Sequence, residues 1–264
     1  MRDYHTHSNF SSDCRTPMDA MLARAASLGI SEYAVTDHYD PDYPDESFPF
    51  DLDFDRYHES LLAMEAKYRP SLRLVKGIEI GIQHGKTMDK CRAAARAFPY
   101  DFVLGSFHCA DGMDICRDLF FEGREPEDAC MAFYRYMLRC LGEYKDYDVL
   151  AHFNIIDRYV GRVPDYGIYS ELIEDIVLLL INDGKGIEIN TSSFRYGMGG
   201  RTTPSAEILR HYVRMGGETV TVGSDAHRAE DIGHMLGRAE DMARSAGLRY
   251  LAAFKDRKAE YLRI

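Results

Sequence analysis

Residues 72–82, LRLVKGIEIGI, form a short apolar run of the β type with one acidic residue, Glu79, inside it. An ionised carboxylate buried in such a strand costs several kcal/mol unless a partner compensates its charge. A metal ion is one such partner, and it needs further ligands from elsewhere in the chain. The fold must therefore bring other polar strand ends close to Glu79.

Six more runs of this kind occur along the chain, and five of them bring His, Asp or Glu to their carboxyl ends. They cover residues 3–7, 33–38, 102–108, 149–152, 186–192 and 219–227. The run 186–192 ends in Asn190, Thr191 and Ser192 and offers no ligand of its own. Ligands so far apart in sequence can share one site only if the fold gathers these ends.

Amphipathic segments with apolar residues at helical spacing separate the runs. They cover residues 17–28, 57–68, 88–98, 126–144, 169–182, 204–215 and 229–246. Thr16 and Thr203 each precede a proline and are predicted N-caps. The predicted helix ends are marked by Gly29, Gly184, Gly216 and Gly247.

Seven alternations of strand and helix predict an α/β fold with parallel strands and right-handed crossovers. An open sheet would concentrate its polar residues at one switch point, whereas here nearly every strand end contributes. This distribution favours a barrel whose site lies at its C-terminal face. The expected fold is a seven-stranded (β/α)7 TIM-like barrel, formed as a single domain over residues 1–264.

Charge and composition exclude several classes of protein. The chain has 43 acidic and 32 basic residues and a formal net charge of −11, which argues against a nucleic-acid or membrane surface. Residues 1–7 contain no apolar signal region, and no stretch approaches the roughly 20 apolar residues of a membrane span. We therefore expect a cytoplasmic protein that acts on a small molecule. The oligomeric state is left open.

Cysteine usage supports this expectation. The six cysteines contain no C-x-x-C pair, so they are expected to be reduced and mostly structural. Cys14 and Cys109 each stand beside a candidate ligand, and either could line the site.

Nine candidate metal ligands occupy the strand ends. They are His5, His7, Asp13, His38, Glu79, His108, His152, Asp225 and His227. His5 and His7 share one face of a strand, as Asp225 and His227 do if their strand continues. The carboxylate of Glu79 could bridge two ions about 3.5–4 Å apart. Imidazole and carboxylate ligands without thiolate pairs suit Zn, Mn or Fe.

Other polar features have simpler interpretations. His58, His84, His211 and His234 fall on predicted helices or loops and are expected to be structural. Residues 39–55 carry seven acidic residues among prolines and aromatics. This segment is either a solvated surface loop or a lid beside the site, since it directly follows His38.

Six short motifs occur in the order HTH (5–7), TDH (36–38), GIE (77–79), GSFH (105–108), AHF (151–153) and SDAH (224–227). Together they resemble the polymerase and histidinol phosphatase (PHP) family of metal-dependent phosphoesterases. The resemblance implies a distorted seven-stranded barrel with three divalent ions. His5, His7, Glu79 and Asp225 would bind the first ion, and Glu79, His108 and His152 the second. The third would be bound by Asp13, His38 and His227.

Within this family the chain is most similar to the monofunctional histidinol-phosphate phosphatases of histidine biosynthesis. The supporting segments are residues 5–13, 105–112, 151–159, 187–195 and 204–209. The resemblance implies that Arg158 and Arg195 bind the substrate phosphate, for which their bidentate geometry is suited. Asn154 departs from the pattern, because such enzymes often carry an acid in this segment.

The expected function is hydrolysis of a small phosphomonoester, L-histidinol phosphate, by a multinuclear metal centre that activates water. Glu79, Asp225 and His227 are the expected catalytic residues. Either Asp225 or a water on the third metal would protonate the leaving group.

Three alternatives remain open. The substrate could be a nucleotide or the end of an oligonucleotide. The chain could be a non-catalytic metal-binding module, although such modules are expected to lose ligands. It could also be a C–N hydrolase of the amidohydrolase type, but the usual carboxylated lysine lacks a clear counterpart, Lys76 lying three residues before Glu79.

Overall fold

A computed structural model describes residues 1–198 and 200–264. Seven parallel strand positions form a nearly closed barrel in the order β1-β2-β4-β5-β8-β9-β10. Their bounds are β1 (Arg2–Asp3), β2 (Glu32–Val35), β4 (Arg73–Gly81), β5 (Phe102–Ser106), β8 (Val149–Leu150), β9 (Gly186–Asn190) and β10 (Val220–Gly223). A short strand, β3 (His38–Tyr39), continues the β2 position and also pairs with β4.

Hydrogen bonds between the first and last strand positions close the sheet on itself. Tyr4 N–H donates to the Val222 carbonyl at 2.9 Å, and Asp225 N–H donates to the His5 carbonyl at 2.7 Å. An open sheet would leave these edges unpaired. The prediction of a seven-stranded barrel is therefore confirmed.

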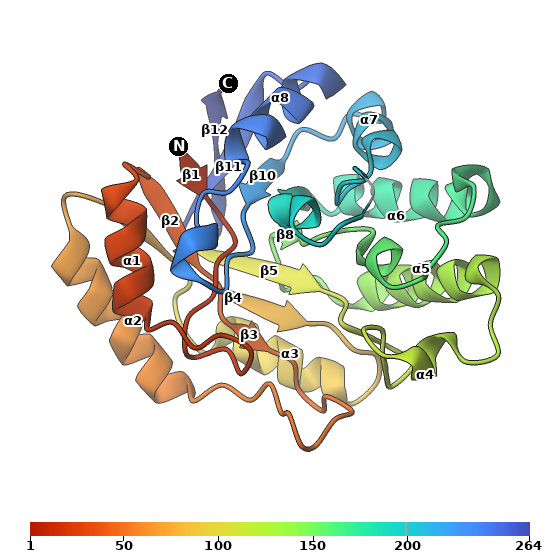
Figure 1. Ribbon diagram of the computed structural model, residues 1–264, viewed down its shortest axis with the longest axis horizontal. Helices are drawn as coiled ribbons and strands as arrows, with labels where there is room; N and C mark the ends of the chain where they lie inside the picture. Colours follow the sequence, from red (N-terminus) through yellow and green to blue (C-terminus); the bar gives the residue numbers. More distant parts are fainter. Residues whose placement is uncertain (199) are drawn as a thin grey trace.

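Helices surround the strands (Figure 1). They are α1 (Met18–Ser27), α2 (Phe54–Tyr68), α3 (Thr87–Arg96), α4 (Asp118–Phe121), α5 (Pro126–Glu143), α6 (Ser170–Asn182), α7 (Ala206–Arg214) and α8 (Leu236–Ala246). Short 3-10 helices are η1 (Ile155–Arg158), η2 (Tyr166–Ile168), η3 (Thr191–Phe194) and η4 (Ala229–Asp231). The apolar faces of the long helices pack on the outside of the barrel and form the main core. Six of the seven predicted helices are present near their predicted bounds, and the seventh, predicted over 229–246, is an α-helix only over 236–246.

The predicted N-caps are wrong, whereas the predicted C-terminal glycines are right. Thr16 directs its hydroxyl to the His227 carbonyl, and α1 begins only at Met18. Thr203 is bound to the end of β9, because its carbonyl accepts from Asn190 N–H at 2.7 Å. Ser205 caps α7 instead, accepting from Ile208 N–H. The four predicted glycines all have positive φ angles, between 66° and 103°.

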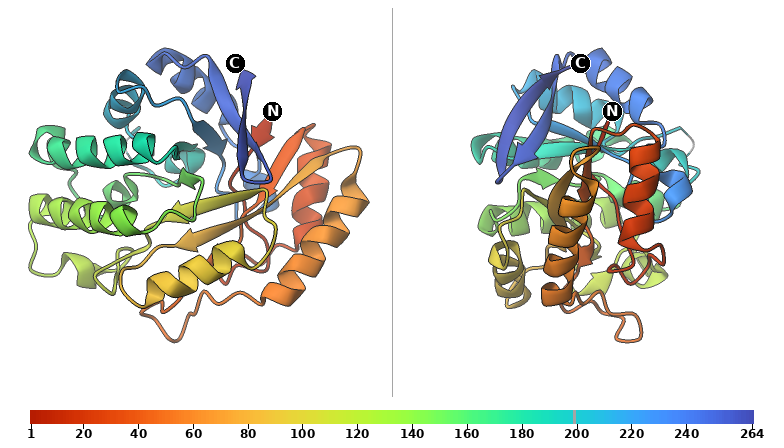
Figure 2. Two further views of the ribbon diagram at one scale, coloured as in Figure 1. Left: turned by 180° about the vertical axis from the view of Figure 1, so that it is seen from behind. Right: turned by 90° about the vertical axis from the view of Figure 1, so that its left-hand side faces the viewer.

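A C-terminal hairpin, which the sequence did not predict, covers the amino-terminal end of the barrel. It consists of β11 (Tyr250–Lys255) and β12 (Lys258–Arg263), and Figure 2 shows it in the view from behind. Phe254 N–H donates to the Tyr4 hydroxyl at 2.9 Å, and Arg73 donates to the Phe254 carbonyl at 2.7 Å. Arg73 is the first residue of β4 and Tyr4 lies in the first strand position, so the hairpin covers the end of the barrel opposite the carboxyl ends of the strands.

A second, smaller hairpin pairs β6 (Cys109–Ala110) with β7 (Met113–Asp114) just after β5. Throughout the part of the chain that the structure describes, no helix combines the length and apolarity needed to cross a membrane.

Candidate active site

The structure brings all nine candidate ligands together at the carboxyl ends of the barrel strands. The cluster contains four overlapping groups of three residues each. Within each group, the three atoms that could bind a metal lie within 4.8 Å of one another. The groups are His5–His7–Asp225, His5–Glu79–His152, His38–Glu79–His108 and His7–His38–His227. Asp13 joins the last group through its contact with His227 Nε2 at 3.1 Å. The groups share members, so the cluster is continuous.

Glu79 lies at the centre of the cluster, fully buried, and its two oxygens face different histidines. Oε2 lies 3.0 Å from His5 Nε2 and 3.1 Å from His38 Nδ1. Oε1 lies 3.0 Å from His152 Nε2 and 3.5 Å from His108 Nε2. A carboxylate placed in this way is able to bridge two cations.

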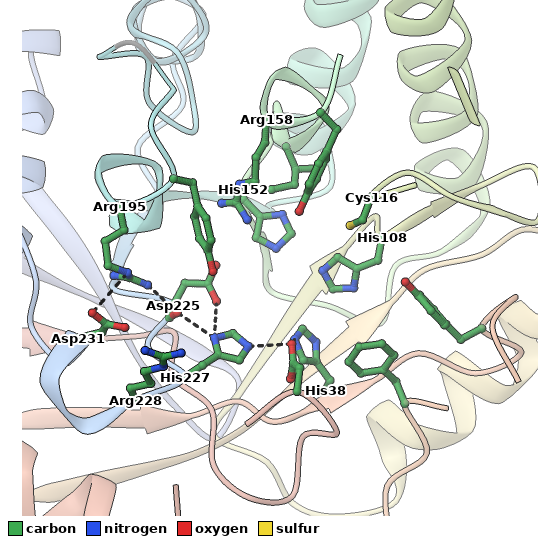
Figure 3. Close-up of a pocket in the computed structure, with 16 residues that line it drawn as sticks. His38, His108, Cys116, His152, Arg158, Arg195, Asp225, His227, Arg228 and Asp231 are labelled. Atoms are coloured by element: carbon green, nitrogen blue, oxygen red, sulfur yellow. Dashed lines mark hydrogen bonds and ion pairs between the residues drawn. The ribbon is translucent and has the colours of Figure 1, made fainter. Parts of the chain in front are cut away.

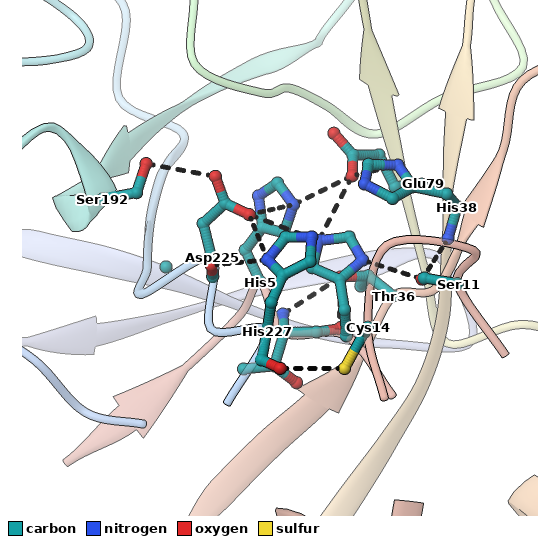
Figure 4. A network of polar contacts seen from close by, with 12 residues as sticks. His5, Ser11, Cys14, Thr36, His38, Glu79, Ser192, Asp225 and His227 are labelled. Atoms are coloured by element: carbon teal, nitrogen blue, oxygen red, sulfur yellow. Dashed lines mark hydrogen bonds and ion pairs between the residues drawn. The ribbon is translucent and has the colours of Figure 1, made fainter. Parts of the chain in front are cut away.

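Asp225 approaches the same Nε2 atoms of His5 and His7 that face Glu79, and Figure 4 shows its carboxylate beside His5. Its Oδ1 lies 3.3 Å from His7 Nε2 and 3.7 Å from His5 Nε2. Its Oδ2 accepts from the Ser192 hydroxyl at 3.1 Å. Through Ser192, the run 186–192 supports Asp225, although none of its residues belongs to the four groups.

Two of the nine residues have unusual backbone conformations. His152 has φ 26° and Asp225 has φ 54°, where residues other than glycine are rarely found. Such strain costs about 1–3 kcal/mol and persists only where surrounding contacts hold it. His152 N–H donates to Glu188 Oε2 at 3.0 Å, and Arg195 donates to the Asp225 carbonyl at 2.9 Å. These contacts hold the two strained backbones in place at a cost in stability, and they direct both side chains into the cluster.

The residues fit a metal-binding role on chemical grounds. His7 Nε2 and His227 Nε2 are buried and make no well-directed hydrogen bond among the described residues, although each lies within 3.3 Å of a carboxylate oxygen. Burial and the charge of His227 hold the pKa of His7 well below its ordinary value, which favours the neutral imidazole that a metal binds. Burial alone would raise the pKa of Glu79, but His5 and His38 hold it well below its usual range. Glu79 is therefore ionised.

His5 differs from His7 in its charge. Burial alone would lower the pKa of His5, but Glu188 and Glu79 raise it well above its ordinary value. A cation that binds His5 Nε2 must therefore displace a proton.

Two buried carboxylates that the sequence analysis missed orient the candidate ligands. Glu188 on β9 lies with Oε1 2.8 Å from His5 Nδ1, and its Oε2 accepts from the His152 backbone and from Asn190. Asp40 Oδ1 lies 2.7 Å from His108 Nδ1. Both contacts leave the Nε2 atoms of these histidines directed at Glu79. Carboxylate partners of this kind fix the orientation of metal-binding imidazoles.

The sequence contained a signal for Glu188. The segment KGIEI occurs twice, at 76–80 and 185–189, and places Glu79 and Glu188 in equivalent strand contexts. Glu188, like Glu79, is a carboxylate in an apolar strand and needs a partner that compensates its charge. Asp40 carried no comparable signal, because it stands among many acidic residues of an irregular loop.

We expect Glu188→Gln to lower metal affinity or kcat/KM by about 10- to 100-fold, because an amide cannot accept from both His5 and the His152 backbone. Metal titration combined with phosphoesterase kinetics would measure the effect. Glu174→Gln on the exposed surface of α6 is the matched control and should behave like the wild type. Unchanged metal affinity and activity in Glu188→Gln would contradict this supporting role.

A pocket of about 490 Å³ opens above the cluster (Figure 3). Arg158 and Arg195 both line it, together with Asp13, His38, His108, His152, Asp225 and His227. Arg158 donates to the Ser192 hydroxyl at 2.8 Å, stacks on the Tyr196 ring at 4.1 Å, and has a buried Nε without a partner among the described residues. Arg195 donates to the Ser224 and Asp225 carbonyls, both at 2.9 Å. The sequence analysis did not anticipate Cys116, Arg228 or Asp231 in this lining.

The loop 39–55 forms part of the pocket wall. Tyr43 and Phe50 line the pocket, and the Phe50 ring lies 5.2 Å from that of His38. The Tyr43 hydroxyl donates to Asp114 at 2.6 Å, which joins the loop to the β6–β7 hairpin. The segment therefore lies beside the site, as the lid interpretation requires.

Other residues considered in the sequence lie outside the pocket lining. His58 stacks on Phe98, His84 pairs with Glu143, and neither contributes to the lining, nor do His211 and His234. Lys76 Nζ lies 3.1 Å from Asp101 and 3.3 Å from Glu65, which is not the position of a carboxylated metal-bridging lysine. All six cysteines are free. Cys14 is buried and contacts the His227 carbonyl, and Cys109 is also buried.

Known proteins show the same combination of fold and length. The chain is 29% identical over 256 residues to the probable histidinol-phosphatase of Clostridium acetobutylicum, covering 94% of each chain. It is 25% identical over 270 residues to the histidinol-phosphatase of Lactococcus lactis, covering 98% of this chain and 96% of the relative. The crystal structure of histidinol phosphate phosphatase from Lactococcus lactis subsp. lactis superposes with a TM-score of 0.87 at 24% identity, covering 98% of each chain.

A family model described as the PHP domain matches residues 3–192, which is most of the chain. The match begins before the HTH motif and ends after β9, so it includes seven of the nine clustered residues. Asp225 and His227 lie beyond it and complete the cluster. The chain belongs to the PHP domain family.

Proposed function

We propose that this chain, acting as a single domain over residues 1–264, hydrolyses L-histidinol phosphate to L-histidinol and phosphate. The observation that carries the proposal is the pocket in which Arg158 and Arg195 stand beside a cluster of histidines and carboxylates. Relatives similar over nearly their whole length are named histidinol-phosphatases. The structural neighbour was solved with zinc, L-histidinol and phosphate.

Three divalent cations, chosen from Zn, Mn and Fe, are the proposed cofactors. His5, His7, Glu79 and Asp225 would hold the first, Glu79, His108 and His152 the second, and Asp13, His38 and His227 the third. When bound, such cations acidify a water molecule and neutralise charge on the phosphoryl group. The two carboxylate oxygens of Glu79, which face different histidines, support its bridging role.

The side chains around the pocket serve the substrate directly. Arg158 lines the pocket, and its guanidinium would donate to a phosphate oxygen. Charge-assisted hydrogen bonds of this kind stabilise the equatorial oxygens as the phosphoryl group transfers. Either Asp225 or a water on the third cation would protonate the leaving group. The Ser192 hydroxyl donates to Asp225 Oδ2 and would orient it. Tyr43 and Phe50 line the pocket, where their rings would limit the access of bulk water to the reacting groups.

The direct test is phosphate release from L-histidinol phosphate, measured against a panel of nucleotides and simple phosphomonoesters with metal analysis of the same sample. We expect kcat/KM for L-histidinol phosphate to exceed the others by at least about tenfold, or about 1.4 kcal/mol. Near-equal rates across the panel would contradict the proposal that L-histidinol phosphate is the substrate. Absence of phosphate release from every ester would favour a C–N hydrolase or a non-catalytic module.

The two arginines should respond differently to replacement. Arg158→Ala should raise KM by about 10- to 100-fold with unchanged metal content, because it removes a charged hydrogen-bond donor worth about 1.5–3 kcal/mol. Arg195→Ala should raise KM and also lower metal content, since Arg195 holds the strained backbone of Asp225. Steady-state kinetics with elemental analysis would separate the two, with exposed Arg210→Ala as the control. Metal loss in Arg158→Ala would show that its role has been misassigned.

A further inference from the structure

Asn154 is a fully buried amide that no role described above requires. Its Nδ2 donates to Asp157 Oδ2 at 2.7 Å and to the Thr202 carbonyl at 3.2 Å. Its Oδ1 accepts from Ser205 N–H at 3.1 Å. Every polar atom of the side chain is therefore engaged, and the partners come from two separate loops.

The two loops that Asn154 joins are those that carry the pocket arginines. Arg158 ends η1, which begins directly after Asn154. Arg195 follows η3 and lies in the same connection as Thr202 and Ser205, between β9 and α7. At the pocket surface Arg158 crosses the same gap by contacting Ser192 and Tyr196. Asn154 therefore joins the two loops in the protein interior, and Arg158 joins the same two loops at the pocket surface.

We infer that Asn154 is a positioning residue that holds the Arg158 loop and the Arg195 loop at the spacing needed to bind one phosphate group. The inference deepens the proposed function, on which it rests for the identity of the phosphate ester. Among the described residues, the Asn154 side chain makes no hydrogen bond to a candidate metal ligand and does not line the pocket, so its effect would be transmitted through the arginines.

The chemistry of the amide explains why an acid does not suit this position here. An acid would have no N–H to donate to the Thr202 carbonyl, and it would face the carboxylate of Asp157. Asp157 is itself buried, and its Oδ1 has no partner among the described residues. Burial raises the pKa of Asp157 to about 6, although the Asn154 amide opposes this shift. A second buried carboxylate would be repelled by that of Asp157 and would add its own cost of burial.

The test compares Asn154→Asp and Asn154→Ala with the wild type, all loaded with zinc. Calorimetry measures the affinity for inorganic phosphate, kinetics measure KM and kcat for L-histidinol phosphate, and elemental analysis measures metal content. We expect phosphate affinity to fall and KM to rise by about tenfold or more, with kcat changed less and metal content unchanged. A defect confined to folding would lower active enzyme without changing KM.

Two further variants make the test specific. Asp157→Asn alone keeps an acceptor for the Asn154 amide and should resemble the wild type. Combined with Asn154→Asp, it restores the donor–acceptor pair with reversed polarity and should recover part of the lost phosphate affinity. If Asn154→Asp does not fold, Asn154→Ala and the double variant carry the same comparison.

Unchanged phosphate affinity in the folded Asn154 variants would overturn the inference. Loss of metal together with phosphate affinity would also overturn it, because Asn154 would then act on the metal cluster. If the wild-type protein binds phosphate but does not hydrolyse L-histidinol phosphate, the proposed substrate is wrong, but the inference about Asn154 is not affected. The inference would in that case be decided by the phosphate affinities.

Discussion

Replacing Glu79 with Gln should lower kcat/KM by about 10³-fold or more, equivalent to about 4 kcal/mol of transition-state stabilisation. Glu79 Oε2 contacts His5 and Oε1 contacts His152, each at 3.0 Å. An amide nitrogen cannot bind a cation in place of one of these oxygens, and the change removes the negative charge that faces both His5 and His152. Metal content should fall with activity, by at least one ion per chain.

The measurement is elemental analysis of the purified variant together with phosphate release. Glu143→Gln is a suitable control, because Glu143 also pairs with a histidine, His84, but on the exposed surface away from the pocket. It should retain full metal content and activity. Full turnover by Glu79→Gln would exclude the bridging role of Glu79.

Replacing Gly223 with Ala should disturb both the fold and the metal cluster, although Gly223 is not among the residues that line the pocket. A Cβ atom at this position would overlap Glu188 Oε1 and the Cβ atom of His5. Neither neighbour is free to retreat, because Glu188 is held by the His152 backbone and Asn190, and His5 Cβ is fixed by the strand backbone. We expect the free energy of unfolding to fall by about 1–3 kcal/mol. Metal affinity should fall by about 10- to 100-fold as His5 loses its partner.

Thermal or denaturant unfolding and metal titration would measure these two effects. Gly237→Ala provides the control, because Gly237 lies on the exposed face of α8 with open space around its Cβ position. This variant should match the wild type or gain about 0.4–1 kcal/mol of stability. Wild-type metal affinity in Gly223→Ala would show that the contact between Glu188 and His5 does not matter for the cluster.

Local patterns predicted the strands and helices well, and the fold class followed from their alternation. The prediction from local patterns fails for the helix 229–246. In its place the structure forms the 3-10 helix η4, a break and then α8. The predicted N-caps Thr16 and Thr203 failed for a similar reason. Each is engaged by a residue distant in sequence, the His227 carbonyl and Asn190 respectively. Such tertiary contacts override local capping preferences.

The C-terminal hairpin shows a further limit of local patterns. Its inner residues join Tyr4, Phe102 and Val149 in a second apolar cluster at the amino-terminal end of the barrel. Nothing in residues 250–263 indicates that they close a barrel formed by much earlier strands. Only the packing of the assembled barrel creates the surface that the hairpin covers.

The sequence by itself determined which side chains could bind metal and that they stand at strand ends, because residue type and hydrophobic period are local properties. In the run LRLVKGIEIGI, it placed Glu79 in a buried strand and required partners for it. Only the tertiary structure decided which atom of each residue faces Glu79. Those orientations depend on Glu188, on Asp40 and on the left-handed backbones of His152 and Asp225, all held by hydrogen bonds between distant segments.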